Sequence, residues 1–252
     1  MVSVIVPVWN DAPALDSLLS ELCAEGSSLE LIVVDGGSND NCRAMTTRYP
    51  QVRFLESARG RGRQMNKGAA SAGGDILLFL HADTHVSLEA IQELPALMEN
   101  GGADFGAFRV RFDPSCWLLE KLAFFTRFSL HWTCFGDQGI FVRRDFFEAT
   151  EGFPDITLLE DVHWLRKAAR MGRMTRSPQT VVTSGRRFEK NGAVRQVFEN
   201  VIILLKDQLG FSPNLLAKIY NKEHSKNLAF SKAIENQNLP TETTTSFSVR
   251  SK

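Results

Sequence analysis

The sequence predicts an α/β fold in which a doubly wound, mostly parallel sheet carries helices on both faces. Three observations predict this fold. Short apolar runs alternate with helical patterns over the first hundred residues, the runs are apolar throughout, and a helical segment separates each run from the next. The chain has 252 residues, of which 43% are hydrophobic, and this is enough to bury a core of that kind.

The first half of the chain shows these elements in a regular order. The expected strands are VSVIVPV, LELIVVD, VRFLES and DILLFLHA, and the expected helices are 13–24, 40–48, 62–72 and, after the last strand, 87–99. Asp11 or Asn10 can cap the first helix, and Asn39 or Asp40 can cap the second.

From about residue 101 the pattern changes. The stretch ADFGAFRVRF alternates as a strand with one exposed face does, and QGIFVRR is expected to be another strand. Between them, residues 116–132 are rich in aromatic side chains at helical spacing. The loop GFPDITLLED should lead into a helix of roughly ten residues closed by Gly172, and 193–209 should be an amphipathic helix.

Charge and cysteine usage narrow the class of protein. Lys plus Arg and Asp plus Glu are equal at 29 each, so no global field favours nucleic acid, and we expect no nucleic-acid partner. The four cysteines lack C-x-x-C spacing, which indicates a reducing compartment. No secretory signal and no membrane-spanning stretch is expected. We therefore expect a cytoplasmic protein, either soluble or peripheral at the inner face of the membrane.

Polar residues follow several of the predicted strands. Asn10, Asp35 and Asp83 each lie at or just beyond a strand end, and ligands of such sheets bind outside the carboxyl ends of the strands. The Asp35 carboxylate can accept from a base N–H or a ribose hydroxyl, although an ordinary Asp-Gly turn is the plainer interpretation. Asp83 suits a hard cation such as Mg²⁺ or Mn²⁺ completed by substrate phosphates, with a helix cap as the alternative.

The same stretch also contains H-x-D-x-H, formed by His81, Asp83 and His85. On a strand this spacing would place three ligands on one face and would favour zinc. A metallohydrolase is therefore the runner-up hypothesis. The plainer interpretation of His85 is a solvated loop residue.

Two further segments carry charges that suit a phosphorylated substrate. The stretch ARGRGRQMNKGAA concentrates cations at the start of a helix, where arginines and free amides favour a diphosphate; the alternative is a solvated basic loop. Asp161 follows Glu160 where TLLED meets a helix, and an ionised Asp at the rim of a cleft can take a proton from an alcohol; the alternative is a cap. Lys206 and the aromatic group Phe124, Phe125, Phe128 and Trp132 could meet a membrane surface, but such stripes are more often core.

Taken together, the chain resembles the family 2 glycosyltransferases, which have the GT-A nucleotide-diphospho-sugar transferase fold. The resemblance rests on VSVIVPVWN, VVDGGSND, GRQMNKGAASAGGDILLFLHADT, GDQGIFVRR and EGFPDITLLEDVHWLRKAARMG. These stretches occur in the family's order and cover nearly the whole span from residue 2 to about 190. Within the family, the chain is most similar to a branch of short, stand-alone bacterial enzymes.

The resemblance implies a role for several residues. It implies that Asp161 is the catalytic base and that Asp83, the last acid of the family's D-x-D, binds a divalent cation, Mg²⁺ or Mn²⁺. The implied nucleotide-sugar-binding residues are Pro7, Asn10, Asp35, Arg63, Asn66, Ala82, Arg186 and Arg187. The chain departs from the family pattern in having His81 as the first residue of D-x-D and Asn10-Asp11 in place of N-E.

We therefore expect a metal-dependent, inverting glycosyltransferase that uses a UDP- or GDP-sugar as donor and a hydroxyl compound of unknown identity as acceptor. A non-catalytic nucleotide-sugar-binding protein is a third hypothesis. The expected organisation is one domain over 1–225, followed by a flexible tail at 226–252. The domain would consist of a nucleotide-binding half (1–100), an acceptor half (101–190) and C-terminal helices (191–225).

Overall fold

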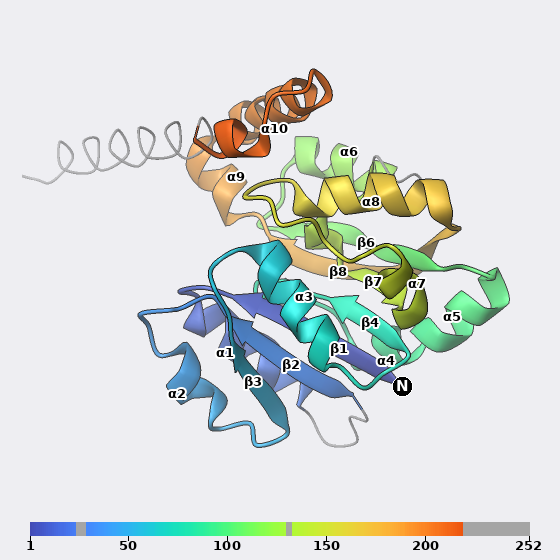
Figure 1. Ribbon diagram of the computed structural model, residues 1–252. Helices are drawn as coiled ribbons and strands as arrows, with labels where there is room; N and C mark the ends of the chain where they lie inside the picture. The colour runs from blue at the N-terminus through green and yellow to red at the C-terminus, as the bar shows by residue number, and fades with distance from the viewer. Residues whose placement is uncertain (24–28, 130–132, 219–252) are drawn as a thin grey trace, which may run out of the picture.

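The centre of the molecule is an eight-stranded sheet, seen in a computed structural model that describes residues 1–23, 29–129 and 133–218 (Figure 1). Across the sheet the strands follow the order β3-β2-β1-β4-β7-β6-β8-β5. The strands are β1 (Val2–Val8), β2 (Glu30–Asp35), β3 (Val52–Glu56), β4 (Ile76–Phe79), β5 (Thr84–His85), β6 (Phe105–Asp113), β7 (Ile140–Arg143) and β8 (Met174–Ser184). Strands β3, β2, β1 and β4 are parallel, whereas β7 is antiparallel to both β4 and β6. The predicted α/β fold with a mostly parallel sheet is confirmed.

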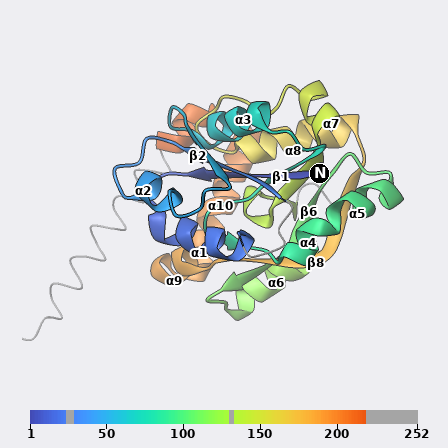
Figure 2. The same cartoon turned by 90° about the horizontal axis from the view of Figure 1, so that it is seen from below.

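Helices cover both faces of this sheet. Figure 2 shows α3, α7 and α8 on one side of it and α1, α4 and α5 on the other. The helices are α1 (Ala12–Leu22), α2 (Cys42–Thr46), α3 (Arg61–Ser71), α4 (Leu88–Gln92), α5 (Leu94–Gly101), α6 (Trp117–Phe125), α7 (Arg144–Ala149), α8 (Glu160–Met171), α9 (Arg186–Asn191) and α10 (Ala193–Gln208), with a 3-10 turn η2 (Gly136–Gln138) before β7. Within the described residues, none of these helices is both long and apolar enough to cross a membrane.

Each face of the sheet has its own hydrophobic core, because successive side chains of a strand point to opposite faces. On β1, Val4 and Val6 belong to the core that includes α1, and Ile5 belongs to the core that includes α3 and α8. Helix α3 approaches β1 closely at Gly68, where a Cβ would lie 2.4 Å from Cγ2 of Ile5. This approach brings the first turn of α3 to the carboxyl ends of the strands.

The structure differs from the predicted elements in several places. The helix predicted over 87–99 is two helices, α4 and α5, and Pro95 lies in the first turn of α5, where its missing N–H is tolerated. Strand β8 was not predicted because MTRSPQTVVTS is polar and contains a proline. Trp132 and the predicted tail at 226–252 lie outside the described residues.

A single aspartate accepts hydrogen bonds from the first backbone N–H groups of both α1 and α2. Asp11 is the N-cap residue of α1, but its side chain makes no capping hydrogen bond. Instead, Oδ2 of Asp40 accepts from the N–H of Ala12 at 2.9 Å, and Oδ1 accepts from the N–H of Cys42 at 3.1 Å. Asp40 thereby connects the loops that follow β1 and β2.

Candidate active site

The loops after β1 and β2 are joined by side-chain hydrogen bonds. Asp35, the last residue of β2, accepts from the backbone N–H groups of Gly37 and Ser38 and from the Ser38 hydroxyl. The hydroxyl oxygen of Ser38 accepts from the N–H of Asn10 at 2.8 Å, and Oδ1 of Asn10 accepts from the N–H of Asn39 at 2.7 Å. Asn10 has a φ of 53°, a left-handed conformation that asparagine tolerates well. Asn10 and Asp35 therefore lie together where β1 and β2 end, at the carboxyl ends of the parallel strands.

Gln64 of α3 also contacts the ends of β1 and β2. The sequence had not indicated a role for this residue. Its side chain is buried, and Nε2 donates to the carbonyl oxygens of Val8 and Val34, each at 2.8 Å. The predicted site residue Pro7 is buried in β1, where it pairs with Val34. Gln64 thus fixes the first turns of α3 against the ends of β1 and β2.

A second group of polar side chains surrounds His81, just beyond the end of β4. Oδ2 of Asp161, in the first turn of α8, accepts from the N–H of Gly136 at 2.6 Å. A Cβ on Gly136 would lie 2.9 Å from this Oδ2 and 3.1 Å from Nε2 of His81, so both atoms lie beside Gly136. The charges of Asp83 and Asp161 both act on the His81 imidazole. The structure therefore brings Asp83 and Asp161 to the same histidine from two distant segments.

The His81 ring is surrounded by protein and by charges of both signs. The pKa of His81 is lowered to about 4. Burial is the largest cause, the positive charges of Arg61 and Arg187 act in the same direction, and the charges of Asp83 and Asp161 oppose them. The imidazole is therefore neutral at neutral pH. It stands where the family's D-x-D has its first acid.

Asp137, in η2, is a third acid near this histidine, and sequence reasoning assigned it no role. Its Oδ1 is buried and has no hydrogen-bond partner. Burial, followed by the charges of Asp161 and Asp83, raises the pKa of Asp137 to about 7. The signal in the sequence was an acid between two glycines immediately before an apolar strand, in GDQGIFVRR.

Arg61 is a cation whose charge acts on this acidic group. Its Nε lies 2.6 Å from Oε1 of Glu160, a side chain that is only 3% exposed. Burial raises the pKa of Glu160, and the Arg61 guanidinium opposes this effect. The charge of Arg61 also acts on His81 and on Asp137. The basic stretch before α3 therefore contributes a cation to the acidic group through Arg61.

Arg63 and Asn66 instead contact the segment that precedes α8. Arg63 forms a two-point ion pair with Asp155, with Nε to Oδ1 at 2.5 Å and Nη2 to Oδ2 at 2.8 Å. The Asn66 amide accepts from the N–H of Phe153 at 2.9 Å and donates to its carbonyl oxygen at 2.8 Å. Both side chains thus attach α3 to the loop after α7, and their role in nucleotide binding stays a prediction.

The remaining predicted residues border the acidic group. Ala82 is buried between His81 and Asp83. Burial raises the pKa of Asp11, Asp83 adds to this effect, and Arg186 opposes it, which places Asp83 and Arg186 near Asp11. Nε of Arg186 donates to the Ser184 hydroxyl at 3.0 Å. With Arg187 acting on His81, the start of α9 supplies positive charge to His81 and Asp11, the two residues that also feel the charge of Asp83.

The three ligands predicted from H-x-D-x-H do not converge. Strand β5 contains only Thr84 and His85, and Nδ1 of His85 lies 2.8 Å from Oε2 of Glu21 in α1. Among the described residues, no three His, Cys, Asp or Glu side chains form a group that could hold a metal ion. The Asp83 carboxylate and the partnerless oxygen of Asp137 are hard oxygen donors, which fit Mg²⁺ or Mn²⁺ when substrate phosphates supply the other ligands.

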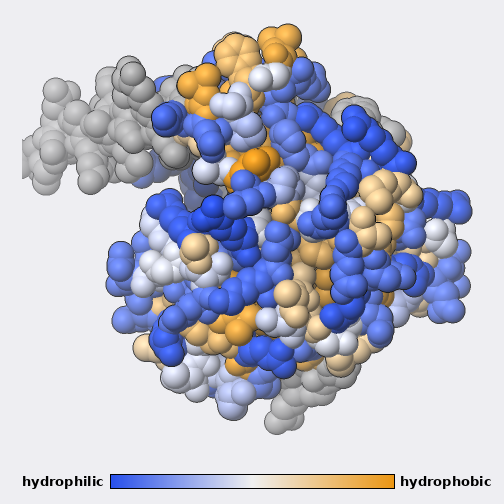
Figure 3. Space-filling view, viewed as in Figure 1, coloured by the Kyte–Doolittle hydropathy of each residue, from blue (hydrophilic) through white to orange (hydrophobic). Residues whose placement is uncertain are grey.

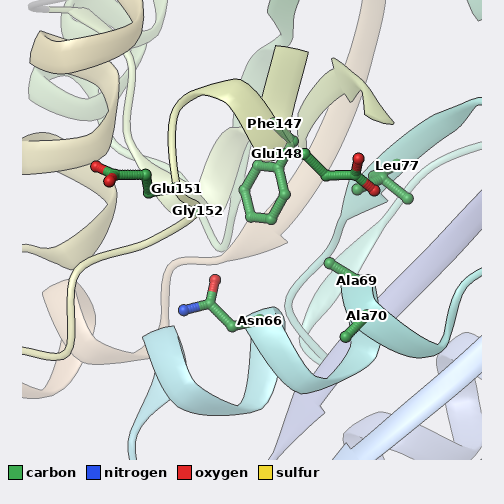
Figure 4. A pocket seen from close by; sticks show the side chains of 8 residues that line it. All are labelled: Asn66, Ala69, Ala70, Leu77, Phe147, Glu148, Glu151 and Gly152. Carbon is green, nitrogen blue, oxygen red and sulfur yellow. The ribbon is translucent and has the colours of Figure 1, made fainter. Parts of the chain in front are cut away.

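A cavity of about 330 Å³ lies elsewhere, between α3 and α7 (Figure 4). Figure 4 shows Asn66, Ala69 and Ala70 on one wall and residues of α7 opposite. Its ionisable lining residues, Glu148 and Glu151, are both acidic, so it does not suit a diphosphate. The polar group around His81 therefore remains the candidate active site.

Comparison with known sequences gives a consistent family. The sequence model described as "Glycosyl transferase family 2" matches residues 3–147, more than half of the chain. Glycosyltransferase AglE from Haloferax volcanii is 27% identical over 188 residues, which are 68% of this chain and 62% of that protein. An undecaprenyl-phosphate 4-deoxy-4-formamido-L-arabinose transferase from Proteus mirabilis is 32% identical over 111 residues, which are 40% of this chain and 34% of that protein. The chain thus spans less than two thirds of the length of either relative.

Solved structures share the fold. The mannosyltransferase PcManGT from Pyrobaculum calidifontis, in complex with GDP-Man and Mn²⁺, superposes with a TM-score of 0.65 at 20% identity, covering 95% of this chain and 76% of that one. TarS from S. aureus, in complex with UDP-GlcNAc, superposes with a TM-score of 0.58 at 19% identity, covering 73% of this chain and 58% of that one. At these identities the likeness concerns the fold alone.

Proposed function

The chain belongs to glycosyl transferase family 2, and from this premise we propose that it transfers a sugar from a nucleotide-diphosphate sugar to a hydroxyl acceptor. The observation that carries the proposal is the meeting of Asp83 and Asp161 at His81. One acid follows a central parallel strand, where ligands of such sheets bind, and the other starts a helix across the same group. Support for the donor class comes from PcManGT and TarS, which were solved with GDP-Man and UDP-GlcNAc.

On the donor side, each charged region has a chemical task. Asp35 and Asn10 lie at the sheet edge, where they can accept from a base or from ribose hydroxyls. Arg61 and Arg187 supply positive charge near His81, and Arg186 supplies it near Asp11; guanidinium groups suit phosphate oxygens. The diphosphate would therefore lie between the first turn of α3 and the start of α9.

On the acceptor side, Asp161 acts as the general base. It takes the proton of the acceptor hydroxyl while that oxygen forms a bond to the anomeric carbon of the donor sugar. The bond between this carbon and the diphosphate breaks, and the bonding electrons leave with the phosphate oxygen. Attack from the face opposite the leaving group inverts the anomeric configuration. The N–H of Gly136 donates to Oδ2 of Asp161 at 2.6 Å and the N–H of Val162 donates to Oδ1 at 2.8 Å. These bonds hold the carboxylate in place, and each oxygen keeps a lone pair that can accept the proton of the acceptor hydroxyl.

We also propose that the enzyme uses a divalent cation, Mg²⁺ or Mn²⁺, held by Asp83. When bound, the cation supplies positive charge that stabilises the departing phosphate. His81 is neutral and therefore adds no positive charge that would repel the cation at this position. The Mn²⁺ present with PcManGT supports this part of the proposal. A cytoplasmic location agrees with the free thiols of Cys23, Cys42, Cys116 and Cys134.

A donor screen tests the proposal. The full chain is incubated with UDP- and GDP-sugars and a panel of hydroxyl acceptors, with Mn²⁺, Mg²⁺ or a chelator, and release of nucleoside diphosphate is measured. We expect Asp161→Asn to lower turnover by at least about 100-fold, in the range of a lost general base. Donor-induced thermal stabilisation should persist in this variant, because the donor side is unchanged.

Two comparisons make the screen decisive. Asp83→Asn should lower turnover and weaken the response to Mn²⁺, whereas Asp145→Asn, at an exposed position in α7, should leave both unchanged. Near-normal turnover in Asp161→Asn would contradict its role. Stabilisation by UDP or GDP without turnover of any donor would identify a nucleotide-sugar-binding protein instead.

A further inference from the structure

Helix α10 turns its apolar side chains to solvent. Its apolar stripe follows helical spacing, and its members are 45% to 77% exposed: Val194, Phe198, Val201, Leu205 and Leu209. The opposite face, which packs on the protein, buries Gln196 and Asp207 beside Ile203. An amphipathic helix that only completed a core would have the reverse orientation, so this stripe is built to contact something outside the chain.

Helix α6 carries a similar exposed stripe, and two cations make cation–π contacts with its aromatic rings. Trp117, Lys121, Phe124 and Phe128 follow helical spacing, and all four side chains are exposed. The Lys121 ammonium lies 5.2 Å from the centre of the Trp117 ring, and the Arg127 guanidinium lies 5.1 Å from that of Phe124. The inner face of α6 is closed by Leu119, which is 1% exposed.

The two helices form one region of the molecule. Helices α6 and α10 contact each other and lie on the same side of the fold, away from α2 and β3 (Figure 1). Figure 3 shows apolar side chains gathered over α10 at the top of the molecule. We call the two exposed stripes together the α6–α10 face.

The composition of this face indicates its partner. On and beside the two helices, the exposed cations Lys121, Arg127 and Arg195 and the half-buried Lys206 outnumber the acids Glu120 and Glu199, and Glu199 is paired with Arg195. The third acid, Asp207, is buried in an ion pair. Aromatic and aliphatic side chains flanked by Lys and Arg are the composition of helices that lie in the interface of an anionic membrane.

A second copy of the chain fits this face less well. A two-fold symmetric dimer would place the same patch against itself and would bring Lys121 and Arg127 towards their own copies. An anionic lipid surface instead satisfies both the apolar side chains and the cations.

We propose that the α6–α10 face docks the protein on an anionic membrane surface. The docked face is connected to the candidate active site, because α9, which begins with Arg186, leads directly into α10. In addition, Asp207 of α10 pairs with His163 and Arg166 of α8, the helix that carries Asp161. Docking would hold the site beside the lipid head groups. The proposal goes beyond sugar transfer and holds whether or not transfer occurs.

Vesicle binding tests the proposal. The full chain is sedimented with vesicles of phosphatidylcholine alone or with about one third phosphatidylglycerol, at low and high salt. We expect binding to the anionic vesicles that weakens as salt rises. Phe198→Ser with Leu205→Ser, and separately Trp117→Ser with Phe124→Ser, should each weaken binding by about tenfold or more, because each removes two large apolar groups from the interface.

Matched variants separate membrane docking from general hydrophobicity. Met171→Ser removes a side chain that is 50% exposed at the end of α8, and it should leave vesicle binding unchanged. Lys121→Gln with Arg127→Gln should reduce binding to anionic vesicles and its salt dependence, with little change in melting temperature. Equal binding by wild type and the α6–α10 variants, or no binding by the wild type, would overturn the proposal. So would a wild-type dimer without vesicles that the serine variants convert to monomer.

Discussion

At Gly136, the absence of a side chain lets two functional groups approach the same backbone atom. A Cβ there would lie 2.9 Å from Oδ2 of Asp161 and 3.1 Å from Nε2 of His81. Gly136→Ala should therefore displace the Asp161 carboxylate or the His81 ring. We expect a loss of turnover of up to about 100-fold, the order expected when a reacting group moves by 1 Å. The measurement is nucleoside diphosphate release with the preferred donor.

Gly101 provides the matched control for this substitution. A Cβ on Gly101 would meet its nearest neighbours at 3.8 Å, which is an ordinary contact. Gly101→Ala should therefore leave turnover unchanged. If Gly136→Ala kept full turnover, Asp161 could not be the base in the position described.

Arg61 and Arg63 both lie in the first turn of α3, but we expect their substitution to affect donor use to different extents. Arg61 faces the acids around His81 through Glu160, whereas Arg63 is paired with Asp155 on the surface. Arg61→Lys keeps the charge beside Glu160 but loses the forked hydrogen-bond geometry. We expect kcat/KM for the donor to fall by about tenfold or more, the equivalent of one charge-assisted hydrogen bond.

Arg63→Lys is the matched substitution and should change kcat/KM for the donor by less than about threefold, because an exposed ion pair contributes little. A larger effect at Arg63 than at Arg61 would place the donor diphosphate near the loop after α7. That result would favour the role that the sequence resemblance implies for Arg63.

The sequence indicated correctly which polar residues lie at the ends of strands. Asn10, Asp35 and Asp83 each follow an apolar run, and parallel strands bring such positions to one edge. Gln64 and Asp137 could not be found in this way, because their burial depends on contacts between segments far apart in the chain. A glutamine within a helical pattern, or an acid before a strand, looks the same in the sequence whether it is buried or exposed.

At the scale of elements, an ion pair links α8 to α10. The Asp207 side chain is 2% exposed and lies 2.5 Å from Nη1 of Arg166 and 2.7 Å from Nε2 of His163. Burial opposes ionisation, but the hydrogen bonds from His163 and Arg166 outweigh it and hold the pKa of Asp207 below its usual value. This link fixes α10 against α8, the helix that carries the proposed base in its first turn.

Asp207→Asn should weaken that link. Asparagine keeps one acceptor oxygen but presents an NH₂ group to the second donor. We expect a loss of about 1–3 kcal/mol in the free energy of unfolding, which corresponds to a drop of several degrees in melting temperature. Glu199→Gln, which weakens the i,i+4 pair with the exposed Arg195 guanidinium in α10, should cost no more than about 0.5 kcal/mol. Equal melting temperatures for the two variants would show that the link contributes no stability.

Element predictions were most accurate where one face of the segment is buried throughout. Strands β1, β2 and β4 were predicted because nearly all the residues in their apolar runs face one of two cores. Strand β8 was missed because its pairing with β6 is determined by that neighbour and not by its own residues. The periodicity of α6 and α10 was visible in the sequence, but periodicity cannot tell which face a helix turns to solvent.

The net charge of the whole molecule is zero, but acidic side chains gather around His81. Asp83, Asp137 and Asp161 act on one another around His81, and the counter-charges come from α3 and α9 on either side of the sheet edge. The fold therefore keeps several acids close together without neutralising all of them. Such an arrangement costs stability and suits a site completed by a cation and a diphosphate.

This cost leads to a prediction for global stability as a function of pH. The pKa of Asp137 is raised from 3.8 to about 7 by burial and by Asp161 and Asp83, so the folded state binds this proton more tightly than the unfolded state. The stabilising contribution of the protonated carboxyl is complete below pH 3.8 and is lost as pH rises towards 7. The side chain of the Asp137→Asn variant does not titrate. The melting temperature of this variant relative to that of wild type should therefore rise between about pH 4 and 7 and then level off.

The melts are measured with a chelator present, and Asp145→Asn serves as an exposed control with no such trend. Adding Mn²⁺ above pH 7 should reduce the advantage of Asp137→Asn, because a cation offsets the repulsion between the ionised carboxylates. A difference between Asp137→Asn and wild type that stays constant from pH 4 to 8 would contradict the raised pKa.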